Sequence, residues 1–193
     1  EMHTDSDTRP IIRSRQGTDS PIRYIPALDA ILENNLIKHT GERLPTTDRD
    51  MKFRLTVRSG DSGFNQDDMT VTVAKDAGPL VVMEPIAEST FTGKSQVAVK
   101  WDVANTQLAP VNCSHMSILF SNDGGQSFDE VLEESTANDG VEIIELPNIT
   151  TNLGRIKVQC LNNIFFNVSP GNFIVNNIGI LDIASSSTDN TEG

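Results

Sequence analysis

The sequence is short of cysteine, histidine and aromatic residues, and these shortages narrow the range of functions that it can carry. Cysteine occurs 2 times and histidine 3 times in 193 residues, while Phe, Trp and Tyr make up 5% of the chain. Basic residues are outnumbered, with 15 Lys and Arg against 27 Asp and Glu and a formal net charge of -12. Because an acidic surface repels a phosphate backbone, we do not expect nucleic-acid binding.

Long apolar runs and a leader sequence are absent as well. No stretch approaches the ~18 consecutive apolar residues of a membrane helix, so no membrane span is predicted. The sequence starts at Glu1 rather than at a methionine, and we expect it to be part of a longer protein. The lack of a signal peptide therefore says nothing about export.

Residues 1–77 are predicted to form a partial β-domain with a short helix and a C-terminal hairpin. The segment 26–38 favours a helix, because Pro26 suits a first turn. Its apolar residues recur at helical spacing: Leu28, Ile31, Leu32 and Leu36. Alternating apolar residues in 52–58 and 69–73 predict two strands with one buried face. Two strands and a helix cannot bury a core alone, so this domain is expected to be incomplete.

Residues 78–176 are predicted to form a complete β-sandwich of the immunoglobulin-like or fibronectin-like kind. Short runs of alternating apolar residues recur in it, with turn clusters about every 8–12 residues. Trp101 is in phase with Val97 and Val99, so we expect it in the core rather than on a ligand-binding face. Residues 177–193 are predicted to be a tail or linker. The predicted fold class is therefore all-β, with tandem sandwiches of which the first is incomplete.

Short motifs in both predicted domains resemble one region of a known protein family. In the first domain they are Ser20–Pro26, Leu44–Thr46, Phe53–Arg58 and Asp67–Val73. In the second domain they are Val99–Ala104, Ala109–Cys113, Ser121–Phe128, Asn138–Gly140, Leu146–Asn148, Arg155–Val158 and Asn163–Ser169. In this order they resemble the region downstream of the catalytic domain in bacterial secreted zinc metallopeptidases of the reprolysin-like type. The resemblance covers about residues 19–175.

The resemblance implies a zinc metallopeptidase as the parent protein and secretion from a bacterial cell. It transfers no catalytic residue to this chain, because a zincin needs a His-Glu-x-x-His motif on a helix. The histidines are His3, His39 and His115, and they lack that spacing. We therefore expect zinc only in a catalytic domain upstream of Glu1. In such a parent protein, Glu1 would be the remnant of the strand that precedes this chain.

Four oxygen-bearing residues crowd the loop between the two strands of the predicted hairpin: Asp61, Asn65, Asp67 and Asp68. Oxygen ligands in a turn are what Ca²⁺ takes, although the spacing is not that of an EF-hand. A calcium site is one hypothesis for this loop, and a solvated acidic turn is the simpler one. No other cofactor is expected in this chain.

Cys113 and Cys160 are candidates for a disulfide, with two buried free thiols as the alternative. They bracket the third and sixth strands of an immunoglobulin-like order, which are antiparallel neighbours in one sheet. Cys113 is out of phase with Met116, so an irregular entry to that strand is needed for the bond. With this irregularity, we predict that the two cysteines are joined.

These observations predict a non-catalytic accessory region that spaces, stabilises or docks its parent enzyme. Its expected partners are the parent's catalytic domain and a protein or glycan surface. The alternative is a carbohydrate-binding or cell-adhesion module, for which Phe64, Phe91 and Phe128 would have to be exposed in a row. A third hypothesis, that the chain is itself a hydrolase, predicts stoichiometric zinc binding. The incomplete first domain also predicts a dimer through an open sheet edge.

Overall fold

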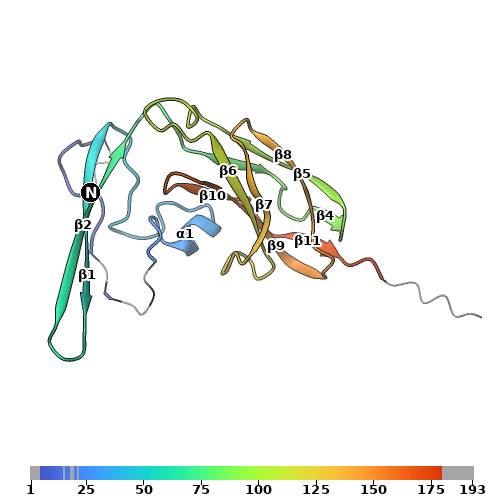
Figure 1. The fold of residues 1–193 in the computed structure, drawn as a ribbon, viewed down its shortest axis with the longest axis horizontal. Coiled ribbons are helices and arrows are strands. Elements are labelled where there is room, and N and C mark those ends of the chain that lie inside the picture. The colour runs from blue at the N-terminus through green and yellow to red at the C-terminus, as the bar shows by residue number, and fades with distance from the viewer. Residues whose placement is uncertain (1–4, 15, 18–19, 21, 180–193) are drawn as a thin grey trace, which may run out of the picture.

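The computed structural model describes residues 5–14, 16–17, 20 and 22–179, which form an N-terminal region and a β-sandwich (Figure 1). The N-terminal region holds α1 (Leu28–Leu32), β1 (Arg49–Arg58) and β2 (Phe64–Val73). The sandwich holds β3 (Val81–Glu84), β4 (Thr90–Thr92), β5 (Gln96–Asp102), β6 (His115–Ser121), β7 (Glu130–Ala137), β8 (Val141–Glu145), β9 (Thr151–Cys160), β10 (Phe166–Val168) and β11 (Phe173–Asn176). None of the helices in these ranges is long and apolar enough to cross a membrane.

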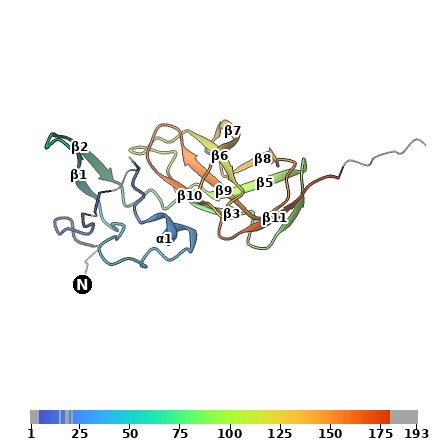
Figure 2. The ribbon, with the colours of Figure 1, turned by 90° about the horizontal axis from the view of Figure 1, so that it is seen from below.

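The sandwich consists of two sheets that pack face to face (Figure 2). One sheet has the order β3-β5-β8, and the other has the order β4-β11-β9-β6-β7 with β10 also paired to β9. Neighbouring strands are antiparallel except for β4 and β11, which are parallel. This arrangement confirms the predicted all-β class and its immunoglobulin-like or fibronectin-like sandwich.

The core lies between the two sheets and follows the alternation of the strands. In β5, Val97, Val99 and Trp101 are buried, and β9 contributes Ile156 and Val158. Full burial of such side chains stabilises the fold by roughly 1.5–3 kcal/mol each. The Trp101 Nε1–H donates to Asn138 Oδ1 at 2.9 Å, so its polar group is satisfied inside the core. The prediction that Trp101 is a core residue is therefore confirmed.

The helix is much shorter than the segment 26–38 predicted from the apolar spacing. It ends at Leu32, and Asn34 follows with a φ of 51°, in the left-handed region that stops a helix. The chain then turns away, and Leu36 and Ile37 are 40% and 70% exposed. Periodicity alone missed this stop, because an asparagine is tolerated inside a helix as well as at its end.

The hairpin is longer than predicted. Its strands pair without a break from Arg49 opposite Val73 to Arg58 opposite Phe64, which leaves only residues 59–63 for the turn. The sequence suggested a ten-residue loop because its polar residues resemble turn residues. Backbone pairing extends past them, since polar residues are acceptable on a ribbon that faces solvent.

What holds the N-terminal region together is a small cluster around the start of α1. Ile11 and Ala30 are buried, and a single bridge pairs Ile12 with Glu42. The buried Glu42 carboxylate accepts hydrogen bonds from Arg23 Nη2 at 2.9 Å and from the Ala27 backbone N–H at 2.8 Å. The strand suggested at Glu1 lies outside the described residues, as does the predicted tail from residue 180 onward.

Candidate functional site

The hairpin presents two chemically different faces. Neighbouring residues of a strand point to opposite sides, so the register of β1 and β2 assigns every side chain to one face. We call one side the apolar hairpin face, formed mainly by Met51, Phe53, Leu55, Val57, Met69 and Val71. We call the other side the polar hairpin face, formed mainly by Asp50, Lys52, Arg54, Thr56, Arg58, Gln66, Asp68, Thr70 and Thr72.

The polar hairpin face is stabilised by cross-strand polar contacts. Arg54 Nε and Nη2 donate to the two carboxylate oxygens of Asp68 at 2.6 and 2.7 Å. The hydrogen bonds from Arg54 lower the pKa of Asp68, and those to Asp68 raise the pKa of Arg54. Nearer the base, Thr72 Oγ1 donates to Asp50 Oδ1 at 2.7 Å. This face is therefore matched within the hairpin itself.

The four residues of the calcium hypothesis are not brought together. Asp61 is in the turn, whereas Asn65, Asp67 and Asp68 are in β2. Asn65 and Asp67 lie on the apolar hairpin face, and Asp68 lies on the opposite face with its carboxylate bound to Arg54. One ion cannot be ligated from both faces of a ribbon. Within the described ranges, the chain gathers no metal-binding group of three or more His, Cys, Asp or Glu residues.

The N-terminal region docks on the outer side of the sandwich through Arg155. This residue of β9 is buried, and its guanidinium donates to Leu32 O at 3.1 Å, Ser169 O at 2.6 Å and Asn172 Oδ1 at 2.6 Å. Burial lowers the pKa of Arg155, and the three acceptors offset that cost. The contact joins the end of α1 to the sheet.

Aromatic contacts extend this junction. Tyr24 meets Phe166 edge-on, with ring centroids 5.4 Å apart. Lys157 Nζ lies 4.9 Å from the Phe166 centroid and 5.6 Å from that of Phe128, within cation–π range. Burial lowers the pKa of Lys157. The Lys157 side chain thus lies between the ring of Phe166 in β10 and the ring of Phe128 in the loop before β7.

The turn after β6 supports the same junction. Asp123 accepts hydrogen bonds from Ser121 Oγ at 2.6 Å and from Ser127 N at 3.0 Å and Oγ at 2.8 Å. Burial alone would raise the pKa of Asp123, but the hydrogen bonds from both serines lower it to about 2. Gly125 completes the turn with a φ of 92° and lies against Leu32. The predicted turn thus forms part of the surface on which α1 docks, and no sequence pattern indicated this contact.

Cys113 and Cys160 are joined by a disulfide, with their Cα atoms 6.1 Å apart. Cys113 precedes β6 in an irregular segment in which Asn112 has a φ of 52°, and Cys160 ends β9. Since β6 and β9 are neighbours within one sheet, the bond joins the start of β6 to the end of β9 and does not link the two sheets.

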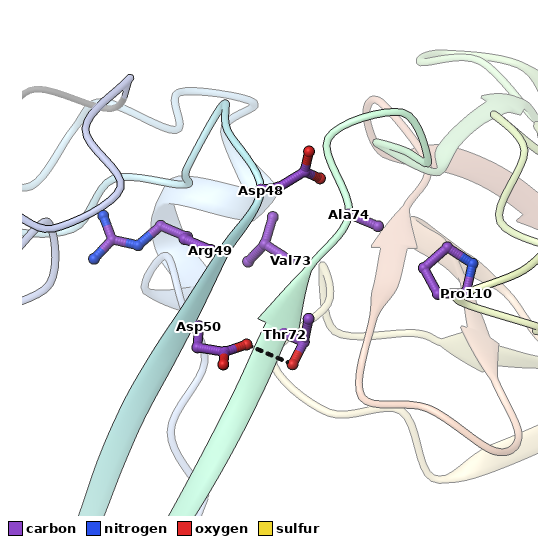
Figure 3. A pocket seen from close by; sticks show the side chains of 7 residues that line it. All are labelled: Asp48, Arg49, Asp50, Thr72, Val73, Ala74 and Pro110. Carbon is purple, nitrogen blue, oxygen red and sulfur yellow. Dashed lines mark hydrogen bonds between the residues drawn. The ribbon is translucent and has the colours of Figure 1, made fainter.

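A shallow depression of about 420 Å³ lies where the hairpin meets the sandwich (Figure 3). It is lined by Asp48, Arg49, Asp50, Thr72, Val73, Ala74 and Pro110, and Arg49 points away from Pro110. Asp48 Oδ1 already accepts the Lys75 backbone N–H at 2.8 Å. Ligand sites usually enclose most of their ligand, and this depression is open. We therefore regard it as the junction between the hairpin and the sandwich and not as a ligand site.

The aromatic residues that would support glycan binding are dispersed. Phe64 is 70% exposed beside the hairpin turn. Phe91 packs edge-on against Phe173 at 5.7 Å, and Phe128 lies beneath Lys157. The three do not form a row.

The two described histidines are also apart, with His39 bonded to Asp29 and His115 at the start of β6, while His3 lies outside the described residues.

Comparisons with known proteins give only distant likenesses. No protein-family model and no curated protein matches the chain. A structure of the fibronectin(III)-like modules of Clostridium thermocellum CbhA is 15% identical in sequence and gives a TM-score of 0.33. The alignment covers 53% of this chain and 100% of the chain in that structure. A chimeric titin Z1Z2 carrying a KLER peptide from decorin is 14% identical in sequence and gives a TM-score of 0.30. That alignment covers 66% of this chain and 62% of the titin chain. Neither likeness bears on function.

Proposed function

We propose that this chain is a non-catalytic accessory region of a secreted bacterial zinc metallopeptidase. Its task is to hold a projecting hairpin, and whatever docks on it, in a set orientation relative to a stable β-sandwich. The observation that carries this proposal is the buried contact of Arg155 with Leu32, which fastens α1 to the sheet. The peptidase itself is inferred from the sequence motifs that resemble that family.

The division into a stable body and a projecting arm suits a spacer. The hairpin extends from the end of the molecule opposite to β4 and β11 (Figure 1). The sandwich has its own core and a disulfide, so we expect it to keep its shape without the hairpin. In this proposal the main partner is the catalytic domain of the same polypeptide, and zinc belongs to that domain.

The disulfide also supports the proposed location. Such bonds persist in oxidising compartments and are rare in the reducing cytosol. Secretion would give Cys113 and Cys160 the conditions in which they stay bonded.

Two measurements test this function. The gene that encodes the chain should contain a His-Glu-x-x-His motif upstream of Glu1, and an open reading frame without one would refute the peptidase parent. The purified chain should neither bind zinc stoichiometrically nor cleave a protein substrate. Peptidase activity that survives purification to homogeneity and disappears with a chelator would overturn the non-catalytic role.

The alternative, a carbohydrate-binding or adhesion module, has only Phe64 in its support among the residues described. Retarded migration of the chain in gels that contain soluble polysaccharides, lost in a Phe64→Ala variant, would favour it over the accessory role. We expect no retardation, since glycan sites of sandwich modules use several exposed aromatic rings side by side.

A further inference from the structure

Each strand of the hairpin has one partner strand among the described residues, so each leaves one backbone edge without a neighbouring strand. In an antiparallel pair, alternate residues turn their N–H and C=O groups away from the partner. The Ser59 N–H donates across the hairpin to Gly63 O at 2.9 Å, which sets the phase of this alternation. The outward groups are therefore those of the even-numbered residues of β1 and β2.

The edge of β2 is blocked by two side chains of β2 itself. The outward N–H of Gln66 donates to Asn65 Oδ1 at 2.8 Å. The outward N–H of Asp68 donates to Asp67 Oδ1 at 3.0 Å. A strand that approached this edge would have to displace both hydrogen bonds, and it would meet the Asp67 carboxylate. The edge of β2 is therefore a poor template for a further strand.

The edge of β1 is open over its outer half. The outward N–H groups of Lys52, Arg54, Thr56 and Arg58 have no hydrogen-bond acceptor in the part of the chain that the structure describes. All four residues are exposed, and the hairpin projects away from the sandwich (Figure 1). An unpaired row of backbone donors and acceptors of this kind is a template for an added strand.

Charge is divided between the two sides of the hairpin. The basic side chains follow β1: Arg49, Lys52, Arg54 and Arg58. The acidic side chains of the turn and of β2 are Asp61, Asp67 and Asp68. Arg54 is paired within the hairpin, whereas Lys52 and Arg58 form no salt bridge with another described residue. The open edge of β1 therefore offers unpaired cations to carboxylates on an added strand.

An added strand would also extend the apolar hairpin face. Leu55 and Val57 of β1 are 59% and 60% exposed on that face. A third strand beside β1 places every second side chain next to them and the remaining side chains next to the cations of the polar hairpin face. Asn65 and Asp67 lie one strand further away, on β2. The partner that fits is a strand in which apolar and acidic residues alternate.

We propose that the outer edge of β1 binds an extended segment of another polypeptide in which apolar and acidic residues alternate. The segment pairs its backbone with the outward N–H and C=O groups of β1 and its carboxylates with Lys52 and Arg58. A second copy of this chain does not fit, because its β1 repeats the same cations and its β2 edge is blocked. The inference does not rest on the peptidase parent, because it uses only the hairpin.

The net charge of -12 does not prevent this contact. At about 3.3 Å per residue, the outer half of β1 begins about 15 Å from the base of the hairpin. Interactions between exposed charges are screened over about 8–10 Å at physiological salt. An acidic segment on the outer half of β1 therefore responds mainly to the basic residues of that strand and not to the acidic residues of the sandwich.

The test uses a short acetylated peptide of alternating valine and glutamate, and the same peptide with lysine in place of glutamate. The binding of each fluorescently labelled peptide to the whole chain is measured by anisotropy. Thr56→Pro removes an outward N–H from the edge of β1, and the matched control Thr70→Pro removes one from the edge of β2. Both substitutions leave the hydrogen bonds between β1 and β2 in place, since neither N–H points at the partner strand.

We expect the glutamate peptide to bind the parent chain and Thr70→Pro equally well, and the lysine peptide to bind at least about tenfold more weakly. Thr56→Pro should weaken the binding of the glutamate peptide at least about tenfold. In the parent chain, bound peptide should slow amide exchange at Arg54, Thr56 and Arg58 and leave exchange in β2 unchanged. This exchange pattern tests the site even if Thr56→Pro fails to form the hairpin.

The absence of binding up to about 1 mM glutamate peptide overturns the proposal. Equal binding of the two peptides, or equal weakening by the two prolines, also overturns it, because the site would then not be an edge of β1 that selects acidic strands. Slower exchange in β2 instead of β1 has the same consequence. Self-association of the chain without peptide, abolished in Thr56→Pro, would give this edge to a second copy and contradict the proposal as well.

Discussion

The guanidinium of Arg155 donates a hydrogen bond to the carbonyl oxygen of Leu32, 3.1 Å away, across 123 residues of sequence. The same group also binds Ser169 O and Asn172 Oδ1, so one buried cation ties the end of α1 to the loop between β10 and β11. A buried charge with fixed acceptors is costly to disturb, because each unpaired group loses its compensation. Arg155 thus holds the N-terminal region against the sandwich.

Replacing Arg155 with lysine should release α1 from the sheet. A lysine carries its donors on one atom and cannot reach three acceptors at once. We expect a loss of about 1–3 kcal/mol in the free energy of unfolding and faster amide exchange in residues 28–35, with the strands of the sandwich still protected. Hydrogen–deuterium exchange read by mass spectrometry measures both.

Arg54→Lys is the control for that substitution. Its partner, Asp68, is exposed, and an exposed ion pair contributes little to the free energy of unfolding because solvent screens it. If both substitutions lower the free energy of unfolding equally, or if amide exchange in α1 is unchanged in Arg155→Lys, Arg155 does not hold α1 against the sheet.

Gly125→Ala should also displace α1, by steric contact. A Cβ on Gly125 would overlap with Leu32 Cδ2, and the φ of 92° is itself unfavourable for alanine. Gly124→Ala shares the second cost without the first, since its φ is 80° and the nearest atom is Asn172 Oδ1 at 3.9 Å. The left-handed conformation costs about 1–2 kcal/mol in both variants.

The difference between the two alanine variants therefore isolates the contact with Leu32. We expect Gly125→Ala to unfold at a lower denaturant concentration than Gly124→Ala, and a second substitution, Leu32→Ala, to relieve part of that difference. If Leu32→Ala lowers the stability of Gly125→Ala as much as it lowers that of Gly124→Ala, the two residues are not in contact.

Removing the disulfide should destabilise the sandwich substantially. Cys113 and Cys160 close a loop with a sequence separation of 47, and the chain-entropy model gives about 4 kcal/mol for a loop of this size. The variant in which both are alanine should show a lower urea midpoint than the oxidised chain, and reducing agent should lower only the midpoint of the latter. A reductant effect of similar size in the alanine variant would show that the destabilisation has another source.

Acid should weaken the turn that supports α1. The pKa of Asp123 is lowered from 3.8 to about 2 in the fold, so its carboxylate stabilises the folded state in full above its unfolded pKa. That stabilisation is lost as the pH falls from about 4 to about 2. Asp123→Asn should lower stability by about 1 kcal/mol at neutral pH, a small effect because solvent screens this carboxylate.

The pH dependence separates this role of Asp123 from a general packing effect. The melting temperatures of the parent chain and of Asp123→Asn should differ most above about pH 5 and converge near about pH 2. A difference that is constant across this range would mean that the charge on Asp123 is irrelevant.

The sequence by itself determined the strands that line the core. The alternation of Val97, Val99 and Trp101 indicates which side chains share a face, because the period of a strand is fixed by its backbone. It did not indicate β4 or β10, since three residues are too few to show a period. It also overestimated the length of α1, which stops because Asn34 adopts a left-handed backbone conformation.

What only the tertiary structure decided is which surfaces meet. Alternation placed Phe53, Leu55 and Val57 on one face of the hairpin and predicted that this face is buried, but Leu55 and Val57 are exposed in the structure. The contact of Arg155 with Leu32 could not be predicted either, since no sequence pattern relates an arginine in a strand to a leucine at a distant helix end. Local patterns follow from the backbone geometry of a few residues, whereas docking depends on groups that the chain brings together only after it folds.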